Sequence, residues 1–455
     1  MNDAMNEARA LLAPMLRERL IASGDDGFEE AAAVVFEGEG RMPSLVARVR
    51  EVDEIRAVVR AAARTGVPFA VRGSGHGYAR PGSVPDGLVL DLRLMGGTEI
   101  DPARRIGVAH AGTTAGEYTH AAAEYGLATG FGDTLTVGIP GLALGGGIGF
   151  LSRRDGLTLD NVLSADVVLA DGSTVQASET RSPDLFWALR GGGGNFGVVT
   201  RMELRLSEAR VVTGGLLAFE PDPRTFAALL TAASTAPAEL SIMVNAMKSP
   251  PAPFLPAERH GKAIIMAIVC HSGNPEHADA VLAPLRSAGK LVADLVRQQA
   301  YPQLFGLAPE QNGARVAQRT GFLDGLDEGV SAAALAAVET APTPVAVVNL
   351  RPMGGAISRV PTGATAFAHR DRAIMATVGM VDRDAERFGA GTAWVEELAS
   401  SAGIGGAAYV NFLDTTGPDS TAAAYPEATL GRLREVKRVF DPQNLFRSNQ
   451  NIPPA

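Results

Sequence analysis

The sequence predicts an α+β fold in which two unlike parts follow one another along the chain. Up to about residue 207, short strand patterns alternate with short helical patterns, and glycine-rich segments separate them. After about residue 208, longer strand patterns alternate with Ala- and Leu-rich helical patterns, as expected for a sheet backed by helices. The 455 residues are 46% hydrophobic, which suffices for two or three domains with large cores.

The first part begins with a helical pattern inside residues 1–40 and continues as a series of short elements. Ser182, Pro183 and Asp184 are typical of a helix start, because Ser caps free N–H groups and Pro fits the first turn. The expected strands are 46–49, 68–71, two within 91–108, two within 160–178 around a hairpin turn at 170–173, and 198–206; the expected helices are 51–65, 114–125 and one beginning at 182.

The second part has longer elements. We expect strands at 214–220, 240–247, 263–271 and 345–352, a last strand at 407–412, helices at 224–235, 276–288 and 332–339, and a final helix at 428–439 that returns to the first part. Cys270, the single cysteine, lies in the apolar strand pattern and is expected to be a small buried hydrophobe.

Composition excludes several classes of protein. A net charge of −9 disfavours binding to nucleic acid, which requires a basic surface. A single cysteine excludes an internal disulfide framework and is typical of a reducing compartment. The first residues lack the pattern of a secretory signal, and no apolar run reaches the ~18–20 residues of a membrane span. We therefore expect a soluble, cytoplasmic protein, for which a homodimer is compatible with the sequence.

The segment 71–78 (VRGSGHGY) is the most informative short motif. A strand pattern leads into three glycines around His76, and glycine allows backbone N–H groups to gather around an anion. A second glycine-rich segment covers 138–149, with LTLDN at 157–161, and a third, DLFWALRGGGGNFG, covers 184–197. A single such loop is often only a turn, but three in this order indicate a binding site for a phosphate-containing group.

Together with the C-terminal segment 440–454 (FDPQNLFRSNQNIPP), these motifs resemble the FAD-linked oxidases of the vanillyl-alcohol oxidase superfamily, in the berberine-bridge-enzyme-like branch near 6-hydroxy-D-nicotine oxidase. The resemblance spans nearly the whole chain and is strongest over 40–205 and 405–455. A Rossmann site is disfavoured, because Gly145–Gly149 lies about 140 residues into the chain rather than at a first strand-to-helix turn.

The resemblance implies a two-part, non-Rossmann FAD-binding domain at 1–207, a substrate-binding domain at 208–415, and a C-terminal segment at 416–455 that returns to the first domain. It implies that two separate loops, 72–77 and 138–149, enclose the pyrophosphate between backbone amides. The implied cofactor-binding residues are Arg72, Gly73, Ser74, Gly75, His76, Gly77, Thr134, Val137, Gly138, Gly141, Gly145, Gly146, Gly149, Asn161, Gly197, Val198, Asn449 and Asn451.

The resemblance also implies a covalent link. The histidine of this motif is bonded to the flavin 8α-methyl group in the branch, and the corresponding residue is His76. Relatives with a second link use a cysteine three residues before a Val-Gly pair, and that position is Thr134 here. We therefore expect FAD held through His76 alone.

Four residues are candidates for catalysis: Tyr78, Tyr409, Asn411 and His369. Tyr78 matches a tyrosine that lines the substrate cavity in relatives, although a packing role stays open. The family segment Tyr-x-Asn-Tyr is Tyr409–Phe412 here, so its second tyrosine is replaced by Phe412. The family's active-site glutamate falls near Thr377, within one residue. Both departures leave a strong side-chain base in doubt, and His369 is a substitute base or a structural residue.

These features predict an enzyme that transfers a hydride from a small or mid-sized amine or alcohol to covalent FAD, which O2 then reoxidises with release of hydrogen peroxide. A flavin-dependent oxygenase of natural-product biosynthesis stays open, because the missing base leaves room for it. A non-catalytic flavin- or ligand-binding protein is a more remote alternative, since a binder gains little from a covalent tether. No motif predicts a metal site.

Overall fold

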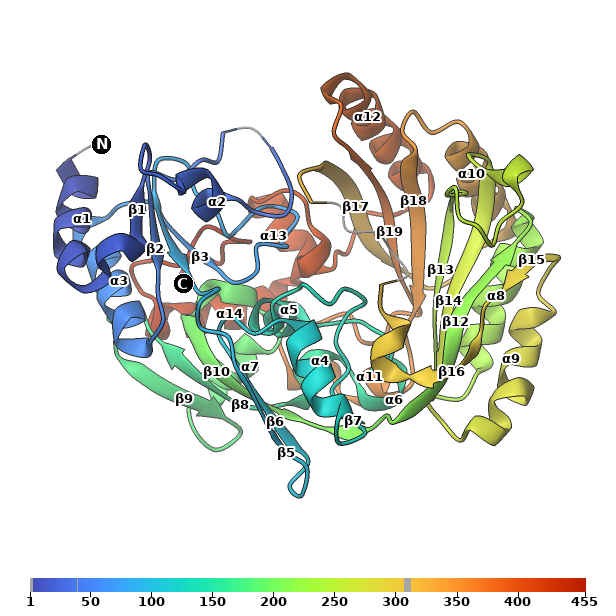
Figure 1. Ribbon diagram of the computed structural model, residues 1–455, viewed down its shortest axis with the longest axis horizontal. Coiled ribbons are helices and arrows are strands. Elements are labelled where there is room, and N and C mark those ends of the chain that lie inside the picture. The colour runs from blue at the N-terminus through green and yellow to red at the C-terminus, as the bar shows by residue number, and fades with distance from the viewer. Residues whose placement is uncertain (1–2, 39, 307–311) are drawn as a thin grey trace.

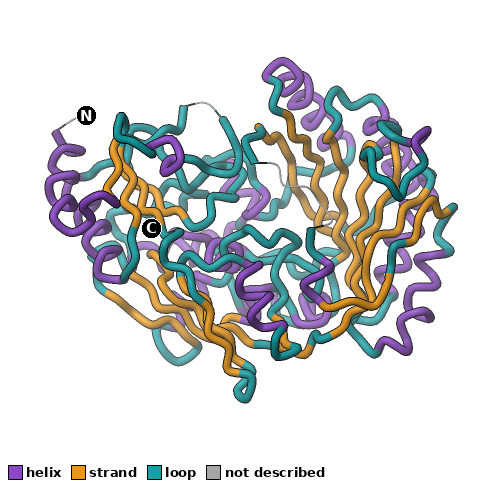
Figure 2. Tube along the Cα trace, viewed as in Figure 1, coloured by secondary structure: helices purple, strands orange, loops and turns teal. Residues whose placement is uncertain are grey.

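The computed structural model describes residues 3–38, 40–306 and 312–455. It confirms the α+β fold: two smaller sheets with their helices form one half, and one large sheet backed by helices forms the other (Figure 1). Figure 2 shows the strands of the large sheet at one side, and loops together with short helices in the middle of the molecule, where the two halves meet.

The first small sheet has the order β1-β2-β4-β3, in which β2, β4 and β3 are parallel. Its strands are β1 (Leu20–Ala22), β2 (Leu45–Arg48), β4 (Leu88–Asp91) and β3 (Phe69–Arg72), and its helices are α1 (Asp3–Leu16) and α3 (Val52–Thr65). Ile55, Val58 and Val59 of α3 are fully buried against the sheet. Because parallel strands end at one edge, Arg72 and Asp91 lie opposite each other and the glycine loop after Arg72 starts there.

The second sheet is antiparallel, in the order β5-β6-β10-β8-β9. It consists of β5 (Thr98–Asp101), β6 (Ile106–His110), β10 (Val198–Arg205), β8 (Val162–Val168) and β9 (Thr174–Ser178); α4 (Ala115–Ala123), α5 (Ile139–Gly145), α7 (Pro183–Leu189) and the C-terminal α14 (Glu427–Phe440) complete its core. The predicted hairpin at 170–173 and the predicted helix at 428–439 are both present.

The C-terminal helix is fixed inside this first half by a buried lysine. Lys437 Nζ donates to the Asn195 carbonyl at 2.7 Å, to Asp441 Oδ2 at 2.6 Å and to the Phe446 carbonyl at 3.0 Å. Burial lowers the pKa of Lys437, although the Asp441 carboxylate opposes this change. Leu433 and Val436 join the same hydrophobic core as α7. The last segment of the chain therefore closes the core that the first half begins.

The third sheet has eight strands in the order β15-β12-β14-β13-β18-β19-β17, with β16 paired to β12, and every pairing is antiparallel. The strands are β12 (Val211–Phe219), β13 (Leu240–Lys248), β14 (Ala263–His271), β15 (Leu291–Asp294), β16 (Arg297–Ala300), β17 (Arg315–Leu323), β18 (Val345–Pro352) and β19 (Ile374–Asp382). As predicted, Cys270 is buried in one of them, β14.

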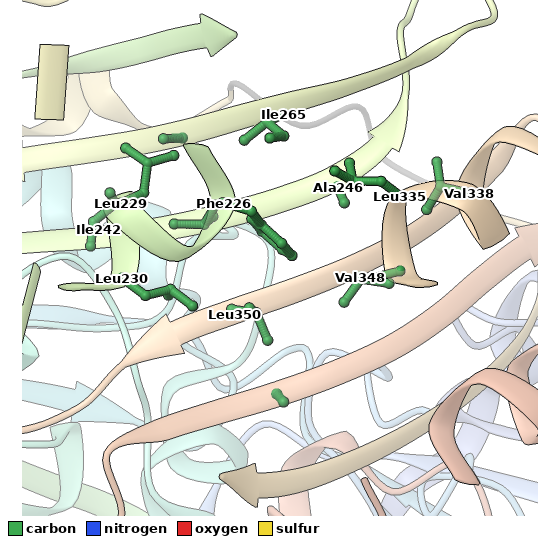
Figure 3. Packing of buried hydrophobic residues seen from close by; sticks show 14 of the residues in the cluster. Phe226, Leu229, Leu230, Ile242, Ala246, Ile265, Leu335, Val338, Val348 and Leu350 are labelled. Atoms are coloured by element: carbon green, nitrogen blue, oxygen red, sulfur yellow. The ribbon is translucent and has the colours of Figure 1, made fainter. Parts of the chain in front are cut away.

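Helices cover one face of this sheet, and the opposite face is turned toward the first half (Figure 1). They are α8 (Pro223–Thr235), α9 (Ala278–Arg286), α10 (Glu328–Glu339) and α12 (Ala385–Ser401). Phe226 and Leu229 of α8 and Leu335 of α10 pack on Ile242 and Ile265 of the strands (Figure 3). A face without helices is available for a ligand.

The remaining elements are short. They are α2 (Phe28–Ala32), α6 (Ser152–Asp155), α11 (Ala356–Arg359), α13 (Pro418–Ala424) and the strand pair β7 (Leu127–Ala128) and β11 (Ser207–Glu208). None of the helices in the described part of the chain is long and apolar enough to cross a membrane.

Two sequence expectations are wrong. The last strand predicted at 407–412 is not a strand, because side-chain contacts rather than a sheet ladder hold this segment, and Val410–Phe412 forms a 3-10 turn. The sheet instead ends with β19, which contains Thr377, and with β17, which was not among the expected strands. The loop predicted at 138–149 contains helix α5, whose first turn includes Pro140.

Candidate functional site

A cavity of about 1120 Å³ lies between the two halves. Typical ligand pockets measure ~300–1,000 Å³, so this cavity has room for a dinucleotide and a small substrate together. Its lining comes from the loop after β3, the loop before α5, residues 193–198, segments 409–413 and 446–450, and the helix-free face of the large sheet.

The loop after β3 is anchored by Arg72. Its guanidinium pairs with Asp91 at 3.0 Å and donates to the Ala32 carbonyl at 3.0 Å, and both charged side chains are buried. Burial alone would raise the pKa of Asp91, but the hydrogen bond from Arg93 and the charges of Arg72 and Arg93 outweigh it and lower that pKa. Arg72 borders the cavity, yet its guanidinium holds the base of the glycine loop.

The glycine loop and the start of α5 form one wall with little side-chain bulk. Ser74 Oγ accepts a hydrogen bond from the Gly138 N–H at 2.7 Å, which joins the two loops. Gly75 has a φ of +85°, a conformation that favours glycine. A methyl group added at Gly73 or Gly141 would meet no atom within 4 Å, so the backbone is open to a ligand there.

The C-terminal segment supplies polar groups to the same cavity. The amide oxygens of Asn449 and Gln450 are buried and have no hydrogen-bond partner in the described residues. An unpaired buried acceptor is costly, so a ligand with O–H or N–H donors would stabilise this segment. FAD offers such donors along its ribityl chain, ribose and adenine, and its phosphates suit the exposed backbone amides. The residues present therefore fit FAD.

Tyr409 and Asn411 reach the cavity from the segment before α13. The Tyr409 hydroxyl accepts from the Gly147 N–H at 2.8 Å and from Asn411 Nδ2 at 3.0 Å, and burial raises the pKa of this phenol. Asn411 Nδ2 also donates to the Leu142 carbonyl at 3.0 Å. A methyl group at Gly145 would collide with Asn411, so this glycine allows the segment to approach α5.

Tyr78 lies among aromatic rings at the end of the glycine loop. It stacks on Phe36 at 4.9 Å and meets the edge of Phe412 at 5.6 Å. Burial, together with the nearby Asp133 carboxylate, raises the pKa of Tyr78 to about 12. The residue is therefore a neutral phenol near neutral pH, which can orient a substrate but is not an ionised base.

Most residues proposed from the sequence border this cavity together. They are Arg72, Gly73, Ser74, Gly75, His76, Gly77, Tyr78, Thr134, Val137, Gly138, Gly141, Gly197, Val198, Tyr409, Asn411 and Asn449, and the replacement positions Thr377 and Phe412 also border it. Its lining does not include Gly145, Gly146, Gly149, Asn161, Asn451 or His369.

The residues outside the lining have other contacts. Asn161 Nδ2 donates to the Asp155 and Leu157 carbonyls. A methyl group at Gly146 would press on Tyr409, and one at Gly149 would collide with the Phe131 carbonyl. His369 Nε2 lies 3.0 Å from the Ala424 carbonyl, its ring faces Phe322, and burial lowers its pKa. These contacts hold neighbouring segments together.

The structure adds a polar network that the sequence did not indicate. Arg351 Nη2 donates to Asp133 Oδ2 at 2.7 Å, and Arg351 Nε donates to Asn349 Oδ1 at 2.9 Å. Asn349 Nδ2 continues to Asn245 Oδ1 at 2.7 Å, and all four residues line the cavity. The alternation of polar residues at 349 and 351 within a strand pattern was the only available signal.

Comparisons with known proteins agree with this geometry. Residues 43–178 match the family model described as "FAD binding domain", and residues 408–453 match "Berberine and berberine like". The (R)-6-hydroxynicotine oxidase of Paenarthrobacter nicotinovorans is 32% identical over 96% of this chain and 97% of its own length. The chain belongs to the berberine-bridge-enzyme-like family of FAD-linked oxidoreductases. The resemblance stated from its motifs is thus confirmed, and the protein is an FAD-dependent oxidoreductase.

Solved structures of this family share the fold. The crystal structure of 6-hydroxy-D-nicotine oxidase from Arthrobacter nicotinovorans has a TM-score of 0.84 and 27% identity, covering 96% of this chain and 98% of that one. A sequence relative, the FAD-dependent monooxygenase FUP4 of Fusarium proliferatum, is 36% identical over 42% of this chain and 37% of its own length.

Proposed function

We propose that this enzyme is an oxidase that takes a hydride from a small or mid-sized amine or alcohol and passes the electrons to O2, releasing hydrogen peroxide. The observation that carries the proposal is the single cavity in which the glycine loop with His76, the phenol of Tyr78 and the amide of Asn411 face the helix-free sheet. The similar oxidase of P. nicotinovorans, named for an amine substrate, supports it.

FAD would occupy the glycine-rich side and supply the hydride acceptor. We propose that His76 forms its covalent link, because this imidazole lies in the loop that borders the cavity. Residues 1–207 and 416–455 would hold the cofactor, and residues 208–415 would hold the substrate. This division is supported by the C-terminal helix, which shares the hydrophobic core of the first half.

The protein side chains would orient and bind the substrate rather than remove its proton. Thr377 and Phe412 carry no ionisable group, and Tyr78 stays neutral because its pKa is about 12. A neutral amine needs no strong base to give up a hydride, so an amine suits this site well. Tyr78 and Asn411 would fix the reacting C–H bond toward the flavin.

Anaerobic mixing with candidate amines and alcohols tests the proposal. Loss of the oxidised-flavin absorbance is expected with at least one of them, and return of air should give one peroxide for each product formed. Persistent flavin colour with every candidate would contradict an oxidase of this class. Oxygen incorporated into the product, with little peroxide, would instead support the oxygenase, which the similarity to a monooxygenase favours as second candidate.

A further inference from the structure

The cavity contains an accessible carboxylate in Asp133. Among the described lining residues, Asp133 is the only Asp or Glu. Its Oδ2 accepts from Arg351 at 2.7 Å, and its Oδ1 accepts from the Thr134 hydroxyl at 3.1 Å. The Asp133 side chain keeps 33% of its surface exposed, against 9% for Arg351, so the carboxylate is the member of the pair that a ligand can reach.

The Arg351 guanidinium is held on several sides. Besides its bond to Asp133, Nε donates to Asn349 at 2.9 Å and Nη1 donates to the Ile148 carbonyl at 3.2 Å. The Phe412 ring lies 5.1 Å from the guanidinium carbon, within the range of a cation–π contact. A ligand anion would have to compete with these partners, so Arg351 serves to hold Asp133 in place.

Electrostatics agree with this assignment of roles. Burial would raise the pKa of Asp133, but the charge of Arg351 and its hydrogen bond outweigh burial and lower that pKa, so the carboxylate is ionised. At Tyr78, burial and the Asp133 charge raise the phenol pKa more than Arg351 lowers it. The Asp133 carboxylate is therefore a negative charge close to Tyr78, which favours a ligand cation or hydrogen-bond donor beside it.

We propose that Asp133 is the substrate-anchoring residue of this site and that the substrate is an amine, or another N–H or O–H donor, whose donor group binds its carboxylate. The inference rests on the proposed function, because it assigns a binding group to that same cavity. Leu216, Met266 and Ile268 line the cavity on the side of the large sheet and would contact the apolar part of the substrate. A carboxylate substrate would be repelled.

Three ligands of similar shape test the anchor: benzylamine, benzyl alcohol and benzoate. Their dissociation constants for the flavin-loaded enzyme would be measured anaerobically by calorimetry. The wild type should bind benzylamine most tightly and benzoate most weakly. Asp133→Asn should weaken benzylamine by about 10–100-fold, the value of a charge-assisted hydrogen bond, and should strengthen benzoate, because Arg351 loses its partner. No preference in the wild type, or an equal change for all three ligands, would overturn the proposal.

Asp160→Asn is the matched control. The Asp160–Arg370 pair, at 2.6 Å, also joins the two halves, but neither residue lines the cavity. This variant should lose thermal stability and keep the wild-type order of the three ligands. Asp133→Glu retains the charge and should keep the preference for benzylamine, which provides a test even if Asp133→Asn does not fold.

The two proposals fail separately. If no amine or alcohol reduces the flavin but Asp133→Asn still reverses the preference between benzylamine and benzoate, the oxidase function is wrong and the anchor stands. If an amine reduces the flavin and the preference does not change in Asp133→Asn, the anchor alone is wrong.

Discussion

The two walls of the cavity are built from different atoms. On the glycine-rich side the backbone faces the cavity, and added methyl groups at Gly73 and Gly141 would enter open space. On the sheet side, the side chains of Asn245, Asn349 and Arg351 face it from neighbouring strands. A wall of backbone suits one constant cofactor, whereas a wall of side chains can change from protein to protein. The cofactor side therefore depends on the local sequence of its loops, whereas the substrate side depends on strand register and on Asp133, which the loop before α5 supplies.

The strongest test of the cofactor wall removes His76. The wild-type protein should stay yellow after acid precipitation and carry the added mass of one FAD, whereas His76→Ala should release all of its flavin on denaturation, because the proposed link is gone. Absorbance of the washed pellet and intact-protein mass measure this. A colourless wild-type pellet would contradict the covalent link, while leaving non-covalent binding of FAD open.

The large sheet, which forms the proposed substrate side of the cavity, packs on a separate hydrophobic core. Phe226→Ala should lower the stability of that core. Phe226 is fully buried between α8 and the large sheet, so truncation leaves a cavity and should cost about 3–5 kcal/mol of unfolding free energy. Denaturant melts measure the loss, and the flavin should remain attached. Thr231→Ala, at an exposed site on the same helix, should change stability little. Equal effects of the two substitutions would show that this packing is not stabilising.

Tyr78 and Asn411 lie where the two walls meet. Tyr78→Phe and Asn411→Ala should each slow anaerobic flavin reduction by about 10–1,000-fold, because a positioned orienting group is lost. The flavin spectrum should persist, since the proposed covalent link is through His76 and not through either of these residues. Stopped-flow absorbance gives the rates. Unchanged rates in both variants would remove these residues from the proposed catalytic set.

The pH dependence of the flavin reduction rate shows whether the ionising group belongs to the substrate or to the enzyme. Below the pKa of an amine, the reduction rate should rise about tenfold per pH unit as the reactive neutral form accumulates, and it should level off above that pKa. The phenol of Tyr78 should not contribute below its own pKa of about 12. Two amines of different pKa should give shifted profiles, whereas a common profile would indicate an ionising group of the enzyme.

The smallest effect is expected at the positions considered for a second link. Thr134→Ala and Cys270→Ser should both retain the flavin, because threonine forms no thioether and Cys270 is buried in β14. Burial also raises the pKa of Cys270 to about 12, so its reactive thiolate is scarce. Peptide mass spectrometry would show the attachment site, and a flavin on a Cys270 peptide would contradict a link through His76 alone.

The sequence predicted the cofactor side better than the substrate side. The motif at 71–78 and the helix predicted at 428–439 each depend on a short, contiguous stretch of sequence. The structure has a loop after β3 at the first and helix α14 at the second. Strand β17 was not predicted, because Arg315, Gln318 and Arg319 interrupt the alternation of apolar residues along it.

Contacts between distant segments explain the remaining errors. The segment 407–412 has the apolar residues of a buried strand, which is why a strand was predicted there. Tyr409 is instead buried by contact with the residues at the end of α5. Asp133 and Arg351 are 218 residues apart, and no short motif encodes their pairing. Such pairs depend on how the two halves dock, which only the folded chain defines.

The return of α14 to the first half has a consequence for synthesis on the ribosome. Lys437 bonds to the Asn195 carbonyl across 242 residues of sequence, and at ~5–20 residues per second those residues take roughly 10–50 s to make. During that interval the first half lacks part of its core and the segment that carries Asn449 and Gln450. The cavity therefore gains its full lining only after residues 446–450 have been made, that is, near the end of synthesis.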